Sequence, residues 1–307
     1  MYGVLQFLLE LTLNGLRSST PVLLVLLGEI LTQRVGVINL GVEGEMLVGA
    51  ASGFAVALIT HNPWLGLAAG MLAGALLSLV HALLCLTLRA NQIASGVCVL
   101  TLGSGLSAYY GTSFVGQHIT GFTGFASSSN SIANLLLGAF TPTVVVALVL
   151  IPLISLWLYR TRTGLVWRTV GESGDVARTV GIKPPRWQFA GIVIGGALSG
   201  LGGAALSVDY TRTWVENMTA GRGLIAVGLV IVARWNPWLA LPAAMLFGGF
   251  EALYLRLQAI GVDISPYLLS TLPYLIPLVV LLMSFRFARQ KGGGMPKELT
   301  NIFRSMQ

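Results

Sequence analysis

Long apolar runs separated by short polar stretches dominate this chain. A helix crosses a bilayer with about 20 apolar residues. Nine runs approach that length, at about 9–31, 42–60, 64–88, 92–112, 142–160, 187–208, 221–235, 238–258 and 266–286. The seventh run is short and ends at Trp235-Asn236-Pro237, which predicts a tight turn into the eighth. The pattern predicts an all-α, polytopic membrane helical bundle of about nine spans, with eight or ten as alternatives. We expect residues 1–307 to form a single transmembrane domain.

The composition supports a membrane protein. The chain is 55% hydrophobic and 9% charged, with a mean hydropathy of +0.81, whereas soluble domains carry about 25% charged residues. Cys85 and Cys98 both lie inside apolar runs, without a C-x-x-C or Cys/His cluster, so we expect neither a disulfide nor a metal site. The glycine-rich stretch 195–207 predicts close packing between helices.

The basic residues indicate the orientation of the chain. Fourteen of the eighteen Lys and Arg residues fall in 159–187, in the C-terminal tail, or in turns on the same side at Arg34, Arg89 and Arg234. The positive-inside rule therefore places this side in the cytoplasm, and nine spans place the N-terminus outside. The net charge of +7 is explained by this topology signal. No basic arm interleaved with aromatic residues is present, so nucleic acid is not an expected partner.

Two stretches are expected on the external side. Residues 113–141 contain no Lys, Arg, Asp or Glu and are rich in Ser, Thr, Gly and Asn, which predicts an outer loop with short helices. The stretch 209–223 is polar and is also expected to face out. Its Tyr210 and Trp214 suit an aromatic belt at the membrane surface, or rings that stack on a planar ligand.

The stretch 38–46, INLGVEGEM, places an amide and two carboxylates at the start of a predicted span. Glu43 and Glu45 point about 200° apart on a helix, so they cannot form an acid/base pair on one face. Asn39 and Glu43 share a face and can either cap loose backbone N–H groups or line a substrate path. For Glu45, an interfacial pair with Arg34 is an alternative.

A second polar cluster, NQIASG at 91–96, supplies Asn91, Gln92 and Ser95 near the inner end of a span. Here too, the residues can either cap the helix or line a substrate path. The residues that we consider for a substrate path are Asn39, Glu43, Asn91, Gln92, Ser95, Tyr210 and Trp214.

The longest loop on the basic side, 160–186, contains VGESGDVARTVGI. Ser173 and Asp175 are plausible caps for a short helix from Asp175 to Val180, which Gly181 ends. Such a helix can lie on lipid headgroups or insert into a groove of a cytoplasmic partner, and the residues alone favour neither.

Known catalytic motifs are missing from the sequence. There is no G-x-x-x-x-G-K-[ST], G-x-S-x-G or H-E-x-x-H, so we expect a non-enzymatic chain without a cofactor. If ATP drives it, a separate polypeptide must bind ATP and Mg. An ion-coupled secondary transporter is a competing hypothesis, although no relay of carboxylates and histidines is visible.

Four stretches resemble a known family: VGVINLGVEGEMLVGA (35–50), NQIASG (91–96), RTRTGLVWRTVGESGDVARTVGI (160–182) and ENMTAGRGLIAVGLVIVARWNPW (216–238). They are similar, in the same order, to permease subunits of bacterial ABC importers for ribose, branched-chain amino acids and nucleosides. INLGVEG and GRGLIAVGLVIVARWNP are most similar to the nucleoside branch, which works with basic-membrane-lipoprotein-type binding proteins. A sugar or branched-chain amino acid permease of the same family is the nearest alternative.

The resemblance implies a type II-like importer permease in the bacterial cytoplasmic (inner) membrane. It implies an ABC ATPase subunit, a second permease subunit and an extracytoplasmic substrate-binding protein as partners. It also implies that the loop 160–186 is the cytoplasmic coupling loop, which contacts the ATPase through Gly171, Glu172, Ala177, Arg178, Gly181 and Ile182. One departure is that Val97–Leu100 stand where the family's Thr and Asn are expected.

Overall fold

The computed structural model describes residues 2–122, 137–261, 265–288 and 294–304, and these residues form helices without a named strand. The helices are α1 (Tyr2–Arg34), α2 (Val42–Thr60), α3 (Pro63–Ala82) with η1 (Leu83–Thr87), α4 (Gln92–Gly111), η2 (Thr112–Phe114), α6 (Pro142–Arg160), α7 (Arg162–Glu172), α8 (Gly174–Thr179), α9 (Pro184–Ala204) with η3 (Ala205–Tyr210), α10 (Arg222–Val232), α11 (Pro237–Ala259), α12 (Pro266–Leu269), α13 (Leu272–Ala288) and α14 (Lys297–Arg304).

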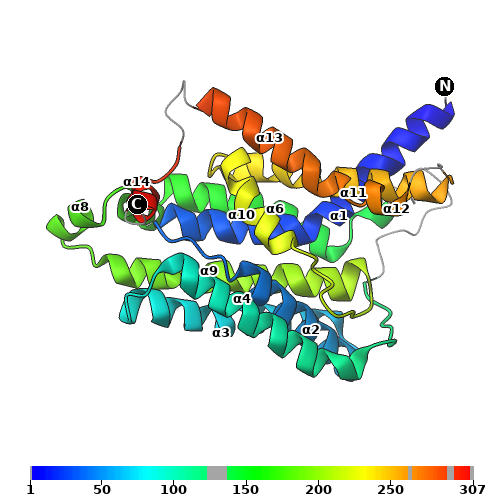
Figure 1. The fold of residues 1–307 in the computed structure, drawn as a ribbon, viewed down its shortest axis with the longest axis horizontal. Helices are drawn as coiled ribbons and strands as arrows, with labels where there is room; N and C mark the ends of the chain where they lie inside the picture. The colour runs from blue at the N-terminus through cyan, green and yellow to red at the C-terminus, as the bar shows by residue number, and fades with distance from the viewer. Residues whose placement is uncertain (1, 123–136, 262–264, 289–293, 305–307) are drawn as a thin grey trace.

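The predicted polytopic helical bundle is confirmed. Among the described residues, seven helices are long and apolar enough to cross a membrane, and they match the first six predicted runs and the eighth. The seventh and ninth runs form shorter apolar helices, Arg222–Val232 and Tyr267–Val280. The long helices lie roughly side by side along the longest axis of the molecule (Figure 1).

The two ends of the bundle differ in character. Helices α7, α8 and α14 lie together at one end, on the left in Figure 1. The end of α1 and the turn 233–236 also lie there, because Arg34 Nε donates to the Trp235 carbonyl at 3.0 Å. We call this the basic end, defined by Arg34, α7, α8, the turn 233–236 and α14. The N-terminus and α12 lie at the opposite end.

The sequence Asn-Pro-Trp-Leu occurs twice, at 62–65 and 236–239, which are 174 residues apart. Both copies have the same local structure. The side chain of each Asn caps the next helix by accepting from the backbone N–H of the Trp, at 3.0 Å in both cases. The residue before each Asn, His61 or Trp235, is left-handed with φ 54°. When residue numbers are shifted by 174, α1, α2, α3 and α4 align with α9, α10, α11 and α13, respectively.

Helix contacts show that this repeat is structural. Gly28 packs so tightly on α9 that a Cβ there would lie 2.8 Å from the Gly195 carbonyl oxygen. Gly202 packs in the same way against Pro21, where the corresponding distance is 2.7 Å. The same shift relates the two contacts. Helix α1 runs toward the basic end whereas α9 runs away from it, so the chain contains an inverted repeat, an architecture common among transporters.

Candidate functional site

In each repeat, the connection between the first and second helix turns back into the bundle. Residues 35–39, between α1 and α2, are buried, although no helix contains them. The connection 211–221, between η3 and α10, brings Thr219 to complete burial, and α10 begins near the middle of the molecule (Figure 1). The expectation that 209–223 lies on the external side stays a prediction, but Trp214 and Thr219 within it are buried in the bundle and are not exposed at its surface. Both are buried because the chain re-enters the bundle to start a half-length helix.

Glu43 holds the start of α10. Its Oε1 accepts hydrogen bonds from the Thr219 hydroxyl and from Gly221 N at 2.8 Å, and its Oε2 accepts from Gly223 N at 2.7 Å. These donors include two of the backbone N–H groups that a helix start leaves without an intrahelical partner. In this structure Glu43 is thus the cap of α10, a helix far away in the sequence, rather than of its own helix.

A buried ion pair lies beside this cap. Arg222, the first residue of α10, donates to Glu251 of α11, and the Ser18 hydroxyl of α1 donates to the other oxygen of Glu251 at 2.5 Å. Arg222 also donates to the carbonyls of Met218 and Thr219. The pair therefore ties α1, α10 and α11 together at the depth where α10 begins.

The connection 35–41 has its own polar partners. Asn39 is fully buried; its amide nitrogen donates to Glu45 at 2.8 Å and its amide oxygen accepts from Gly41 N at 2.9 Å. Glu29 accepts from Asn39 N at 3.4 Å. The alternative that Glu45 pairs with Arg34 is wrong, because the buried Glu45 faces Asn39 inside the bundle.

Gln92 and Ser95 support the same connection from α4. The Gln92 side-chain oxygen accepts from Ile38 N at 2.9 Å. Ser95 lies 3.0 Å from His81 Nδ1, and His81 Nε2 lies 3.2 Å from the Ile38 carbonyl. Asn91 caps α4 by accepting from Ile93 N and Ala94 N. In this structure these polar groups are engaged with backbone and with one another.

The two aromatic candidates lie apart from this network. Trp214 is only 1% exposed and packs with Ala51 and Phe54, against Gly111. Its ring therefore faces no open space in this state. Tyr210 instead lines a cavity, so the seven candidate path residues do not form one common wall.

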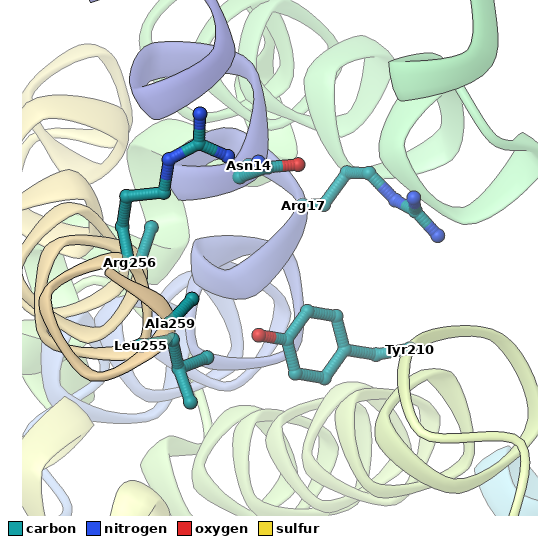
Figure 2. Close-up of a pocket in the computed structure, with 7 residues that line it drawn as sticks. Asn14, Arg17, Tyr210, Leu255, Arg256 and Ala259 are labelled. Atoms are coloured by element: carbon teal, nitrogen blue, oxygen red, sulfur yellow. The ribbon is translucent and has the colours of Figure 1, made fainter. Parts of the chain in front are cut away.

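This cavity, of about 320 Å³, lies between α1, the end of η3 and the end of α11. It is lined by Asn14, Arg17, Tyr210, Ala252, Leu255, Arg256 and Ala259. Figure 2 shows the Tyr210 hydroxyl pointing toward Leu255 and Ala259, while Arg17 extends away from Arg256. The Arg256 guanidinium is also paired with Glu10 at 2.8 Å. Such a mixture of an apolar floor and a few polar donors is typical of small-molecule sites.

Asn14 was not predicted as a cavity residue, and Arg17 and Arg256 were interpreted only as topology signals. A usable signal was present, because Asn14 and Arg17 are polar, three positions apart and inside an apolar run. Such residues share one helix face, and polar groups within spans mark cavities or partners.

The predicted short helix in the loop 160–186 is confirmed. Helix α8 covers Gly174–Thr179, Ser173 caps it by accepting from Val176 N at 3.3 Å, and Gly181 follows it with φ +80°. The preceding helix α7 was not predicted. It begins with a cap at Thr161, which accepts from Gly164 N at 3.0 Å, and buries Trp167, whose indole donates to the Leu31 carbonyl at 2.9 Å.

The six residues expected to couple to an ATPase divide between two faces. Gly171 and Ala177 are buried, and Ile182 is half-buried against the core. Gly171 allows a close approach, since a Cβ there would lie 2.1 Å from the Arg34 carbonyl oxygen. The other three, Glu172, Arg178 and Gly181, are exposed.

Helix α8 also presents apolar surface to solvent. Val176 and Val180 are 56% and 65% exposed, while Ala177 on the other side is fully buried. Arg178 pairs with Asp175 at 2.6 Å on the exposed surface. The helix thus buries Ala177 on one side and displays a small apolar patch next to an ion pair on the other.

The helical bundle, its re-entrant connections and its inverted repeat define a polytopic membrane protein of the transporter class. A family model described as "Branched-chain amino acid transport system / permease component" matches residues 11–284. The chain belongs to this family of ABC transporter permeases, which are transport components.

Individual relatives cover most of the chain. It is 40% identical over 290 residues to TsgC13 of Haloferax volcanii, provisionally named a glucose ABC transporter permease protein, with 86% of this chain and 88% of the relative covered. It is 31% identical to the nucleoside ABC transporter permease protein NupC of Lactococcus lactis, covering 91% and 93% of the two chains. It is 30% identical to the guanosine ABC transporter permease protein NupQ of Bacillus subtilis, covering 91% and 92%.

Proposed function

We propose that this chain is the transmembrane subunit of an ATP-driven importer and that α8 docks on a separate ABC ATPase, which binds ATP and Mg. The exposed patch of Val176 and Val180 on the anchored helix α8 carries this proposal. An amphipathic helix that projects from the bundle suits a groove on a partner protein. In this arrangement the basic end faces the cytoplasm and the protein lies in the cytoplasmic membrane.

The opposite end then receives an extracytoplasmic binding protein. The described part of the loop 113–141 is joined to the connection before α10, because Ile119 N donates to the Arg212 carbonyl at 3.2 Å and Thr213 donates to the Gln117 carbonyl at 3.2 Å. A binding protein that moves this loop also moves the connection 211–221. With a second permease subunit, the two bundles alternate between outward and inward states.

We further propose that the cargo is a nucleoside or a closely related neutral solute. The relatives NupC and NupQ support this cargo by their names. The electrostatics of the bundle agree, because a helix N-terminus attracts an anionic cargo group only when it is free. At α10 that position is already occupied by the Glu43 carboxylate. A branched-chain amino acid, which carries a carboxylate, is therefore less well suited than a neutral solute.

A simple sugar is a second candidate, favoured by the 40% identity to TsgC13. In the cavity at the opposite end, the Asn14 amide and the Tyr210 hydroxyl are suitable partners for sugar hydroxyls, including those of a ribose. Arg17 and Arg256 also line this cavity, and Arg256 is already paired with Glu10. A nucleoside has in addition a planar base that can stack on the Tyr210 ring, which a simple sugar lacks.

The proposal is tested by reconstituting the chain with its co-purifying subunits and the binding protein, and by measuring ATP hydrolysis with a panel of nucleosides, sugars and amino acids. Stimulation of ATP hydrolysis by nucleosides supports a nucleoside as the cargo. Stimulation by sugars alone supports a simple sugar instead. Uptake by the isolated chain, driven by an ion gradient without an ATPase, contradicts the ATP-driven mechanism.

A further inference from the structure

The C-terminal helix α14 (Lys297–Arg304) packs against α7 beside α8, at the basic end (Figure 1). Leu299 is 1% exposed and belongs to the same buried cluster as Trp167 and Ala177. The C-terminal segment is therefore part of the folded basic end, next to the helix for which we propose ATPase docking.

Glu298 connects α8 to the start of the first re-entrant connection. Its Oε1 accepts a hydrogen bond from Gly174 N, the first residue of α8, at 3.3 Å. On the other side, a Cβ on Gly36 would lie 2.9 Å from the Glu298 Cβ, so the Glu298 side chain lies close against the Gly36 backbone. Gly36 is the second residue of the buried connection that leads into α2. The Glu298 side chain thus contacts both α8, the proposed docking helix, and the connection 35–41 that precedes α2.

The same C-terminal segment also reaches the second repeat. A Cβ on Gly294 would lie 3.4 Å from the Arg234 carbonyl oxygen, in the turn between α10 and α11. Gly294 therefore lies beside the turn that follows α10, and Glu298 lies beside Gly36 in the connection that precedes α2. Residues 294–298 are thus close to α8, to the connection before α2 and to the turn after α10.

Helix α8 needs external support to transmit a displacement. It has six residues, and so short a helix is not stable by its own hydrogen bonds. The Ser173 cap is local, whereas Ala177 and Glu298 fix α8 relative to the rest of the bundle. A movement of α8 passes to α7 and α9 along the chain and by direct packing, and to the C-terminal segment through the Glu298 contact.

We propose that Glu298 is a positioning residue and that α14 links α8 mechanically to the Gly36 connection and to the turn 233–236. When a nucleotide-driven partner displaces α8, the connection that precedes α2 and the turn that follows α10 then move together. This inference rests on the proposed docking of α8. If α14 merely covered the core, Leu299 would suffice for that purpose and the Glu298 contact with Gly174 would be dispensable.

The test uses the full transporter, reconstituted in vesicles with its ATPase and binding protein, and compares Glu298→Ala, Glu298→Gln and Glu298→Asp. Thr300→Ala, exposed on the same helix, is the matched control. Bound ATPase, ATP hydrolysis and uptake per ATP are measured. Glu298→Ala is expected to keep assembly and hydrolysis and to lower uptake per ATP on the order of tenfold, as expected when a hydrogen bond to a charged acceptor is lost.

The two conservative variants separate positioning from charge. Glu298→Gln keeps both the length and an acceptor oxygen, so it is expected to restore most of the coupling. Glu298→Asp keeps the charge but is one methylene shorter, so it is expected to behave like Glu298→Ala.

The proposal is overturned by normal coupling in Glu298→Ala, by equal losses in Glu298→Gln and Glu298→Ala, or by loss of ATPase assembly in the Gln variant. If the wild-type chain recruits no ATPase at all, docking through α8 fails and this proposal fails with it. If the wild-type transporter couples ATP hydrolysis to uptake and Glu298→Ala couples them equally well, the role of Glu298 is overturned while docking through α8 stands.

Discussion

Replacing Glu43 by Ala removes the acceptors at the start of α10. Gly221 N, Gly223 N and the Thr219 hydroxyl all lose their partner in a buried site. Each unsatisfied buried donor costs about 1–3 kcal/mol. Because neighbouring losses are not additive and the hydroxyl can rotate, we expect a total of roughly 3–5 kcal/mol. Glu43→Gln keeps an oxygen for two of the donors but turns an NH₂ group toward Gly223 N, so it should cost about 1.5–3 kcal/mol.

Thermal unfolding of the purified chain in detergent measures this effect. One kcal/mol corresponds to roughly 2–4 °C for chains of a few hundred residues, so Glu43→Ala should lower Tm by about 6 °C or more. Glu216→Ala, which removes an exposed carboxylate from the same connection, is the control and should leave Tm nearly unchanged. A Glu43→Ala variant that melts within about 1 °C of wild type refutes the assignment of Glu43 as the cap of α10. Glu43→Gln should retain most uptake, and its loss with intact assembly would place Glu43 in the substrate path.

The remaining predictions concern docking and helix packing. Arg178→Glu should abolish ATP-driven uptake without lowering Tm, since the position is exposed. Gly181→Pro should also abolish uptake, because its φ of +80° is closed to proline and the Gly181 N–H that donates to the Arg178 carbonyl is lost, so the end of α8 is distorted and some loss of Tm is expected as well. Normal uptake by both variants contradicts docking through α8. Gly74→Ala should lower Tm by several degrees because its Cβ would lie 2.3 Å from the Gly196 carbonyl oxygen, whereas Gly105→Ala, with nothing within 4 Å, should not. Equal Tm values for these two alanine variants would show that α3 and α9 are not packed this closely.

Features that depend on neighbours along the chain were predictable. The Ser173 cap and the Gly181 end of α8 are encoded within nine residues, and the structure reproduces both. The long apolar runs likewise gave the correct class of fold, because burial in lipid requires an uninterrupted apolar helix. The short helix α10 was predicted as an ordinary span, since an apolar run does not reveal that its first turn lies inside the bundle.

Features that depend on distant contacts were not predictable in the same way. Glu43 and Gly223 are 180 residues apart, and nothing local to either shows that they meet. The inverted repeat did leave a sequence signal, Asn-Pro-Trp-Leu, at both of its turns. Elsewhere the two halves have diverged, so the repeat becomes convincing only with the matching contacts of Gly28 and Gly202.

The two carboxylates of INLGVEGEM now have a physical explanation. On α2 they point to opposite sides, as their spacing requires: Glu43 binds the start of α10 and Glu45 binds Asn39 in the connection before α2. Each re-entrant segment exposes backbone N–H groups inside the bundle, where water cannot serve as their partner. A carboxylate that already accepts three hydrogen bonds has little capacity left for cargo unless α10 first moves away. A role for Glu43 in cargo binding therefore requires that the start of α10 be released during transport, whereas Asn14 and Tyr210 can meet cargo in the state observed.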